Sequence, residues 1–199
     1  MNTAITVVFS VSYLAITVYL CRGAALRVKD LCYCGICIAL TLVLESFRIP
    51  LPTGATIPLA SMLPLMILSL YSYKLAMLGG FVTGVMALLF VPDWQPVHWG
   101  QVFVEHLVCF SCIGYTGIFG SASKKKLLAG VLLASILKIC GHTLSGVLFF
   151  SQDAWDGWGA WGYSLVYNIS QNVPLAIACG IIFLSIPLKT MQILTKAGA

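Results

Sequence analysis

KICGHTLSGVLFF, residues 138–150, lies within an apolar run that is long enough to cross a membrane, yet it holds a lysine and a histidine. The two residues are four positions apart, so Lys138 and His142 share one face of an α-helix. An ionisable group inside a membrane span costs about 2.5–3.5 kcal/mol on insertion scales and is a candidate for function. The stretch therefore predicts one wall of a polar site within a helical membrane protein.

The composition of the whole chain supports that class. Hydrophobic residues make up 60% of the 199 residues and charged residues only 9%, and the mean hydropathy is +0.98. A soluble domain carries roughly 25% charged residues, so this chain lacks the means to build a water-facing surface. We predict an all-α integral membrane protein of one or at most two domains.

Apolar runs predict seven membrane spans, and a segment at 48–58 with three prolines and a glycine separates the second from the third. The first run has neither the basic start nor the cleavage site of a signal peptide, so we interpret it as a retained helix. The expected spans are 3–21, 31–47, 58–72, 75–91, 100–119, 127–150 and 162–187.

The loop charges predict an orientation in the cell membrane. If loop 22–30 is cytoplasmic and the spans alternate, nine of the ten loop lysines and arginines fall on the cytoplasmic side, and only Arg48 lies outside. The amino terminus is then outside and the carboxyl terminus cytoplasmic. The net charge of +5 comes from these loops, including the run 124–126, so we expect no nucleic-acid partner and membrane lipid as the surroundings.

The eight cysteines lie in or at the ends of apolar segments. Buried cysteine behaves as a small hydrophobic residue, and the spacings do not match a metal site. We expect neither a metal ion nor a disulfide.

All five tryptophans fall in two outer loops, 91–101 and 151–164. Tryptophan commonly anchors a protein at the membrane interface. Aromatic rings can also close over a cationic ligand. Both readings remain open for the set.

Two pairs of polar residues mark the membrane interior. Gln101 and Glu105 share a helical face, as Lys138 and His142 do. Lys138 lies deeper than His142, so we expect it to be a structural counter-charge for Glu105, and a purely structural pair is the alternative. Glu45 is set aside because it lies near the end of its span, beside Arg48.

The last span adds Tyr163, Tyr167 and Asn168 at the depth of these pairs. One acid, several hydrogen-bonding groups and aromatic walls at one level predict an outward-facing pocket. Such a pocket suits a small cationic or nitrogen-heterocyclic solute.

Three stretches resemble a known family. LPLMILSLYSYKLAMLGGFVTG (63–84), QVFVEH (101–106) and KICGHTLSGVLFFSQDAWDGWGAWGYSLVYN (138–168) are similar to the thiamine-binding S component of energy-coupling factor vitamin transporters. The resemblance covers about residues 31–187. It implies a six-helix S-component bundle for residues 31–199, preceded by an extra transmembrane helix and a basic loop, 1–30.

The resemblance also implies partners. The family's S component binds the vitamin and associates with a transmembrane coupling protein and two ATPases, and it topples in the membrane to release the vitamin inside. This chain would then carry no cofactor of its own, and the partner subunits would use the ATP.

Residue by residue, the resemblance implies that Glu105 balances the thiazolium charge of thiamine, while His142, Tyr163 and Asn168 line the pocket. It gives Phe150 an aromatic stacking position. On the first family helix, Gly35 and Ala39 match a small-residue pattern that packs against the coupling protein.

Two departures concern tryptophans of the family pattern. Phe150 stands at a tryptophan position, and Ala55 lies near another, for which Trp94 or Trp99 is a substitute. A hydroxymethylpyrimidine or a B6-like pyridine vitamin is therefore an alternative substrate.

Other classes of protein fit less well. An intramembrane enzyme could use Glu105 and His142 as acid and base, but the sequence shows no nucleophile, metal cluster or cofactor motif to accompany them. The phosphate-binding pattern GxxxxGK[ST] is absent, so we expect no ATP hydrolysis by this chain. A channel would need a repeated pore segment, which the sequence does not contain.

Overall fold

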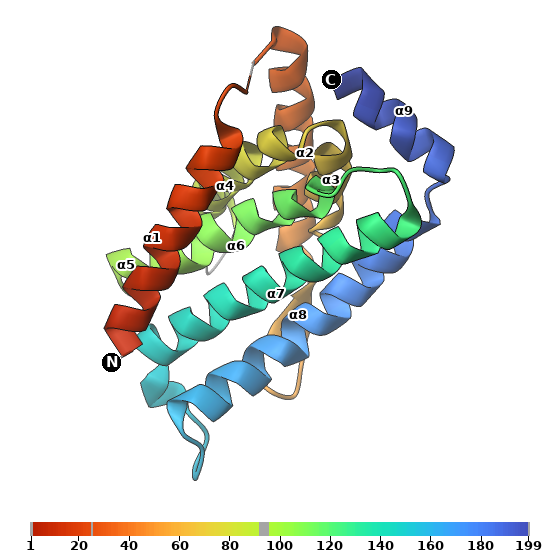
Figure 1. Ribbon diagram of the computed structural model, residues 1–199. Helices are drawn as coiled ribbons and strands as arrows, with labels where there is room; N and C mark the ends of the chain where they lie inside the picture. The colour runs from red at the N-terminus through yellow and green to blue at the C-terminus, as the bar shows by residue number, and fades with distance from the viewer. Residues whose placement is uncertain (1, 25, 92–95, 199) are drawn as a thin grey trace.

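A computed structural model describes residues 2–24, 26–91 and 96–198. It is an assembly of helices with one small hairpin (Figure 1), as the predicted all-α class requires. The elements in chain order are α1 (Asn2–Cys21), α2 (Val28–Ser46), β1 (Arg48–Pro50), β2 (Thr56–Pro58), α3 (Leu63–Tyr71), α4 (Tyr73–Phe90), α5 (Trp99–Gln101), η1 (Val102–Val108), α6 (Cys109–Ser111), η2 (Cys112–Gly117), α7 (Lys124–Phe149), η3 (Ser151–Asp153), α8 (Ala160–Ser185) and α9 (Leu188–Gly198).

Four of the described helices, α1, α4, α7 and α8, are long and apolar enough to cross a membrane. They correspond to four of the seven expected spans. The span expected at 58–72 is shorter than predicted: α3 has nine residues, which is about 14 Å of helix, roughly half of a bilayer core of about 30 Å. Pro64 lies in the first turn of this helix, and the helix stops before Ser72, because Ser72 has extended backbone and caps α4.

The span expected at 100–119 is helical but irregular. It begins as α5, widens into the π-helix η1, narrows through α6 and ends as the 3₁₀-helix η2. Helix type therefore changes three times within segment 99–117. π-Helical turns are rare and are frequently found at functional sites.

The proline-rich break at 48–58 forms an antiparallel hairpin, which the sequence analysis did not predict. Ile49 lies opposite Ile57, and Gly54 in the turn has φ +84°, a conformation that glycine adopts at little cost. The turn reaches α8, where Thr53 Oγ1 lies 3.2 Å from Ser170 Oγ. The hairpin therefore lies beside α8 instead of extending into solvent.

A further helix, α9, follows the last of the expected spans. α9 is amphipathic: Met191 is fully buried, while Lys189, Ile193 and Lys196 are exposed. It packs against α3. Lys124 of α7 donates to the carbonyl oxygens of Leu184 and Ile186 and so satisfies the end of α8 just before α9 begins.

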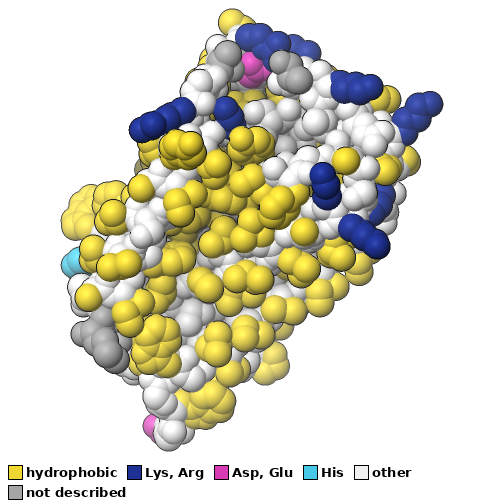
Figure 2. All heavy atoms as spheres, viewed as in Figure 1, with side chains coloured by type: hydrophobic (Ala, Val, Ile, Leu, Met, Phe, Trp, Pro, Cys, Tyr) yellow, Lys and Arg dark blue, Asp and Glu magenta, His cyan; other side chains and the backbone are white. Residues whose placement is uncertain are grey.

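The lysine and arginine side chains visible in Figure 2 lie toward one end of the molecule. The loops α1–α2, α3–α4 and η2–α7 meet there with the end of α9 around a cavity of about 530 Å³. We call this the basic end, defined by Arg22, Arg27, Lys29, Lys74, Lys124, Lys125, Lys126, Lys189 and Lys196.

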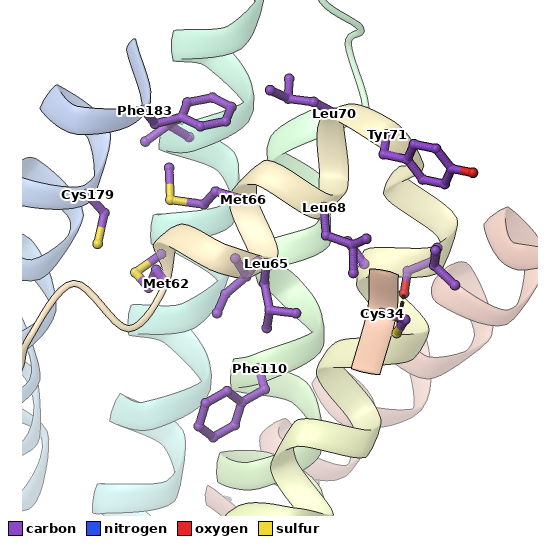
Figure 3. Close-up of a cluster of buried hydrophobic side chains, with 14 of the residues drawn as sticks. Cys34, Met62, Leu65, Met66, Leu68, Leu70, Tyr71, Phe110, Cys179 and Phe183 are labelled. Atoms are coloured by element: carbon purple, nitrogen blue, oxygen red, sulfur yellow. Dashed lines mark hydrogen bonds between the residues drawn. The ribbon is translucent and has the colours of Figure 1, made fainter. Parts of the chain in front are cut away.

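A hydrophobic core fills the body between the helices. Figure 3 shows that side chains of α3, of α6 and of α8 point toward one another. Its largest fully buried members include Phe110, Phe183, Met62, Leu65, Met66 and Leu175. Met191 and Leu127 extend this core to the basic end.

Helix α1 is joined to the body by polar contacts as well as apolar ones. It packs against α4, η1 and α7. Tyr13 OH lies 2.6 Å from Ser111 Oγ, and Thr17 Oγ1 lies 2.9 Å from Tyr115 OH. Both bonds run to segment 99–117, so α1 supports the irregular part of the fold.

Candidate substrate-binding site

A cavity of about 240 Å³ lies between α7, α8, segment 99–117 and the loop after α7. A second cavity of about 120 Å³ adjoins it and shares four lining residues. The larger cavity is lined by Glu105, His142, Gly146, Phe150, Asp153, Tyr163, Ser164, Tyr167 and Asn168. Sequence reasoning had named six of these nine.

Glu105 is the acid that segment 99–117 brings to this cavity. Its Oε2 accepts hydrogen bonds from Gln101 Nε2 at 2.7 Å and Ser145 Oγ at 2.8 Å. Its Oε1 lies 3.6 Å from His142 Nδ1, and 21% of the Glu105 side chain remains exposed. Val97 N donates to Gln101 Oε1 at 2.8 Å, which fixes the orientation of that amide. The carboxylate is thus held on one side and open to the cavity on the other.

The π-helical turn that carries Glu105 is pressed against α4. A Cβ atom at Gly84 would lie 2.3 Å from His106 O, and one at Gly80 would lie 2.5 Å from Phe110 O. Small residues let helix backbones in a membrane approach closely, and at these two positions a Cβ would collide with backbone atoms. The position of Glu105 therefore depends on two glycines of a neighbouring helix.

His142 faces the cavity from α7. The ring is buried, and its Nε2 has no hydrogen-bond partner among the described residues. Asn172 Oδ1, at the smaller cavity, is also buried without a hydrogen-bond partner among the described residues. The NH₂ group of the same side chain donates to Asn168 O at 3.0 Å. Buried polar atoms are rarely left unpaired, so these two atoms can bond a ligand.

Aromatic rings form the other wall. The rings of Trp155 and Tyr163 meet edge to face with their centroids 5.0 Å apart. The ring centroids of Tyr163 and Tyr167 lie 5.6 Å apart. Phe150 lines the same cavity at the end of α7. Trp155, from the loop after α7, packs behind Tyr163 and does not itself line the cavity, and Trp158 and Trp161 of the same segment are exposed.

Three cavity features escaped the sequence analysis. Asp153 adds a second acid to the larger cavity. Glu45, which had been set aside, is buried: it accepts from Ser61 Oγ at 2.7 Å, pairs with Arg48 at 3.6 Å and lines the smaller cavity. The hairpin closes one side, because Tyr167 OH donates to Gly54 O at 3.4 Å. The nearby Arg48 was the sequence feature that could have indicated a buried Glu45. The local sequence does not indicate that Asp153 or the hairpin reaches a cavity.

Lys138 lies one turn deeper than His142 and lines the smaller cavity together with Glu105. Its Nζ lies 5.2 Å from the centroid of the Phe110 ring. Among the described residues, the basic side chain within 4.0 Å of the Glu105 carboxylate is His142 and not Lys138. The two charges thus share a cavity without direct contact, and the role of Lys138 as counter-charge stays a prediction.

The remaining predicted residues lie elsewhere. Gly35 and Ala39 are exposed on α2, away from the cavities. Trp94 lies outside the described residues. None of the eight cysteines forms a disulfide, and no group of three His, Cys, Asp or Glu side chains in the described ranges is arranged to hold a metal.

Known proteins share this fold and sequence. The family model described as thiamine transporter protein (Thia_YuaJ) matches residues 31–195 and so begins after α1. The thiamine transporter ThiT of Bacillus subtilis is 26% identical over 153 residues, which cover 70% of this chain and 79% of that protein. The solved structure of ThiT from Listeria monocytogenes has a TM-score of 0.75 at 23% identity, and covers 85% of this chain and 98% of the other.

The family match spans most of the chain, and the structural match shows the same helical membrane fold. Since the family consists of transporters, the alternative of an intramembrane enzyme built on Glu105 and His142 is wrong. The chain belongs to the thiamine transporter protein family, as a multi-pass membrane S component of the ThiT type.

Proposed function

We propose that this chain binds thiamine in the cavity around Glu105 and serves as the substrate-binding subunit of a vitamin importer. One observation carries the proposal: a partly open carboxylate, held by Gln101, Ser145 and His142, faces a cavity with aromatic walls. Thiamine carries a permanent positive charge on its thiazolium ring, and a fixed carboxylate beside aromatic faces suits such a cation.

The other half of thiamine is an aminopyrimidine ring with hydrogen-bond donors and acceptors. His142 Nε2, Asn172 Oδ1 and Ser164 Oγ are buried polar atoms of cavity-lining residues that have no hydrogen-bond partner among the described residues. Asn168 lines both cavities. Tyr163 and Phe150 supply ring faces at the larger one. These groups can bond the ring edge and stack on its faces.

The alternative substrates fit the site less well. A hydroxymethylpyrimidine or a pyridine vitamin lacks the fixed positive charge, so it would leave the Glu105 carboxylate without a cation in a desolvated site, which is costly. The names of the family and of the similar proteins also favour thiamine.

Replacing Glu105 by Gln tests the proposal. The change keeps the shape and removes the charge, so we expect thiamine affinity to fall about hundredfold, measured by calorimetric titration of the purified protein. Asp156→Asn is the matched control, because Asp156 is an exposed acid in the loop between α7 and α8; it should bind like the unmodified chain. Equal affinity in Glu105→Gln would refute the role of the carboxylate, and a neutral pyridine bound more tightly than thiamine would refute the substrate.

We further propose that α2 docks on a transmembrane coupling protein, that partner ATPases supply the energy, and that the basic end is cytoplasmic. A Cβ at Gly35 would have nothing within 4 Å, so this exposed face admits a close helix. The position of the lysines and arginines supports the orientation.

A bulky side chain on α2 tests the docking proposal. Gly35→Leu should reduce co-purification with the coupling protein severalfold and leave thiamine binding unchanged. Ala178→Leu, on the exposed face of α8, is the control. Undiminished co-purification with Gly35→Leu would place the docking face elsewhere.

A further inference from the structure

We propose that the groove between α7 and α8 binds an anionic phospholipid, with an acyl chain in the groove and the phosphate at Lys125. The groove encloses about 420 Å³ and is separate from both cavities of the candidate site. It is lined by Leu128, Val131, Leu132, Ser135, Ile136, Ile139, Val173, Ala176, Ile177, Gly180, Ile181 and Leu184.

The chemistry of the groove selects an acyl chain. Every lining side chain except Ser135 is apolar or glycine, and the Ser135 hydroxyl donates to Val131 O at 2.7 Å. A polar solute would lose its hydration here without compensation. The groove also lies on two helices that are long and apolar enough to cross a membrane, so the molecules beside it are lipids.

The shape of the groove fits one chain. Val131 and Gly180 are buried and form its floor, while Leu132, Ile177 and Ile181 are exposed along its rims. Gly180 provides the depth: a Cβ there would lie 3.6 Å from Val131 Cγ1, and a longer side chain would extend into the open space. The floor is thus recessed below the lipid-facing surface.

The length of the groove matches one leaflet. It follows α7 from Leu128 to Ile139, which is about 16 Å at the rise of an α-helix. Half of a bilayer core is about 15 Å. The groove is therefore long enough for the hydrocarbon of one leaflet and ends near the membrane centre.

A positive charge stands where the headgroup would lie. Lys125 is exposed and precedes Leu128 by three residues and Leu132 by seven, so it continues the groove face of α7 at the basic end. Lys124 beside it already donates to the end of α8. Figure 2 shows Lys and Arg side chains beyond the hydrophobic side chains of this face. This complementarity favours a phospholipid headgroup with a net negative charge over a zwitterionic one.

Lipid retention by the purified protein tests the proposal. The full chain would be extracted from vesicles of equal phosphatidylglycerol and phosphatidylcholine with identical acyl chains, and native mass spectrometry would count each retained lipid. We expect phosphatidylglycerol to be retained severalfold more than phosphatidylcholine. Lys125→Gln should reduce that preference about fivefold, while Lys126→Gln, an exposed neighbour about 100° around the helix, should leave it unchanged.

A second variant tests the groove itself. Gly180→Leu should fill the floor of the groove and reduce retention of both lipids. If that variant folds poorly, Ala176→Leu replaces it and should have the same effect. Thiamine binding should persist in all of these variants. Equal retention of the two lipids by the unmodified chain, an equal effect of Lys126→Gln, or unchanged retention in Gly180→Leu would overturn the proposal. The proposal would also be overturned if Gly180→Leu retained lipid normally but no longer associated with the coupling protein. The groove would then hold a partner helix.

Discussion

α7 and segment 99–117 both bring ionisable side chains into the apolar body of the molecule, and they do so in different ways. α7 is an unbroken α-helix of 26 residues that carries Lys138 and His142. Segment 99–117 changes helix type three times and carries Glu105. A regular helix satisfies its own backbone, whereas an irregular segment at membrane depth relies on the protein around it.

The neighbours of segment 99–117 supply that support from two sides. On one side Gly80 and Gly84 of α4 let the segment lie directly against the helix. On the other side Tyr13 and Thr17 of α1 bond to its hydroxyl groups. The position of Glu105 therefore depends on contacts of segment 99–117 with α1 and α4. The position of His142 depends largely on α7 itself.

The largest effect should come from filling the contact between α4 and segment 99–117. Gly84→Ala would place a Cβ 2.3 Å from His106 O, and backbone cannot yield as a flexible side chain does. We expect a loss of about 1–3 kcal/mol of stability or more, together with weaker thiamine binding, measured by thermal unfolding in detergent and by titration. Gly35→Ala, where the new methyl group meets open space, should leave both unchanged. A stable Gly84→Ala variant with full affinity would show that the contact with α4 does not position Glu105.

A smaller effect should come from removing the hydroxyl bonds of α1. Thr17→Val keeps the shape of a fully buried residue and removes its bond to Tyr115, and Tyr13→Phe removes the bond to Ser111. Hydrogen bonds between membrane helices average about 0.6 kcal/mol and reach about 1.7, so each variant should lower the unfolding temperature modestly.

The double variant should also weaken thiamine binding, because the bonds run to the segment that carries Glu105. Ser185→Ala is the control, since its hydroxyl bonds only within α8 and is exposed. If the double variant unfolds at the same temperature as the control, α1 does not stabilise segment 99–117, and the support of that segment comes from α4 alone.

The smallest effect should come from the basic end, outside the apolar spans. Hydrogen bonds from Arg27 and then Tyr71 hold the pKa of Asp30 below its ordinary value. Because the folded-state pKa is lowered, this contribution to stability is present above about pH 4, the ordinary range of an aspartate, and is lost as the pH falls through the lower folded value. Arg27 is half exposed, so water screens the pair and the effect is small.

Thermal unfolding at pH 7 and pH 3 measures this contribution. Asp30→Asn should lower the unfolding temperature slightly at pH 7. It should also reduce the difference between the unfolding temperatures measured at pH 7 and pH 3. A loss at pH 7 larger than that of Gly84→Ala would contradict the view that the supports of segment 99–117 dominate.

Much of the fold follows from the sequence because membrane helices are signalled by composition over long windows. The four long helices, the break at 48–58 and the pairing of Gln101 with Glu105 were predicted in this way. Helical spacing put Lys138 and His142 on one face, which holds because α7 is regular throughout, and the depth of His142 and the family resemblance assigned it to the pocket.

The rest depends on contacts between distant residues. The prolines at 48–58 indicated a break, but the hairpin forms because Ile49 pairs with Ile57 and its turn meets Ser170. The π-helical turn lies directly against Gly84 of α4, and hydrophobic periodicity does not reveal such a contact. Asp153 reaches the cavity only because the loop after α7 folds back onto α8.

The fully buried core has a consequence for how a bound molecule leaves. The smaller cavity ends at Leu175, and Lys138 beside it lies over Phe110; beyond these two side chains the core continues to Met191 at the basic end. Threading a vitamin through would expose several large apolar side chains at about 1.5–3 kcal/mol each, which approaches the whole stability of a typical domain, about 5–15 kcal/mol. The packed core therefore closes the direct path from the cavities to the basic end, because crossing it would cost a large part of the stability of the fold.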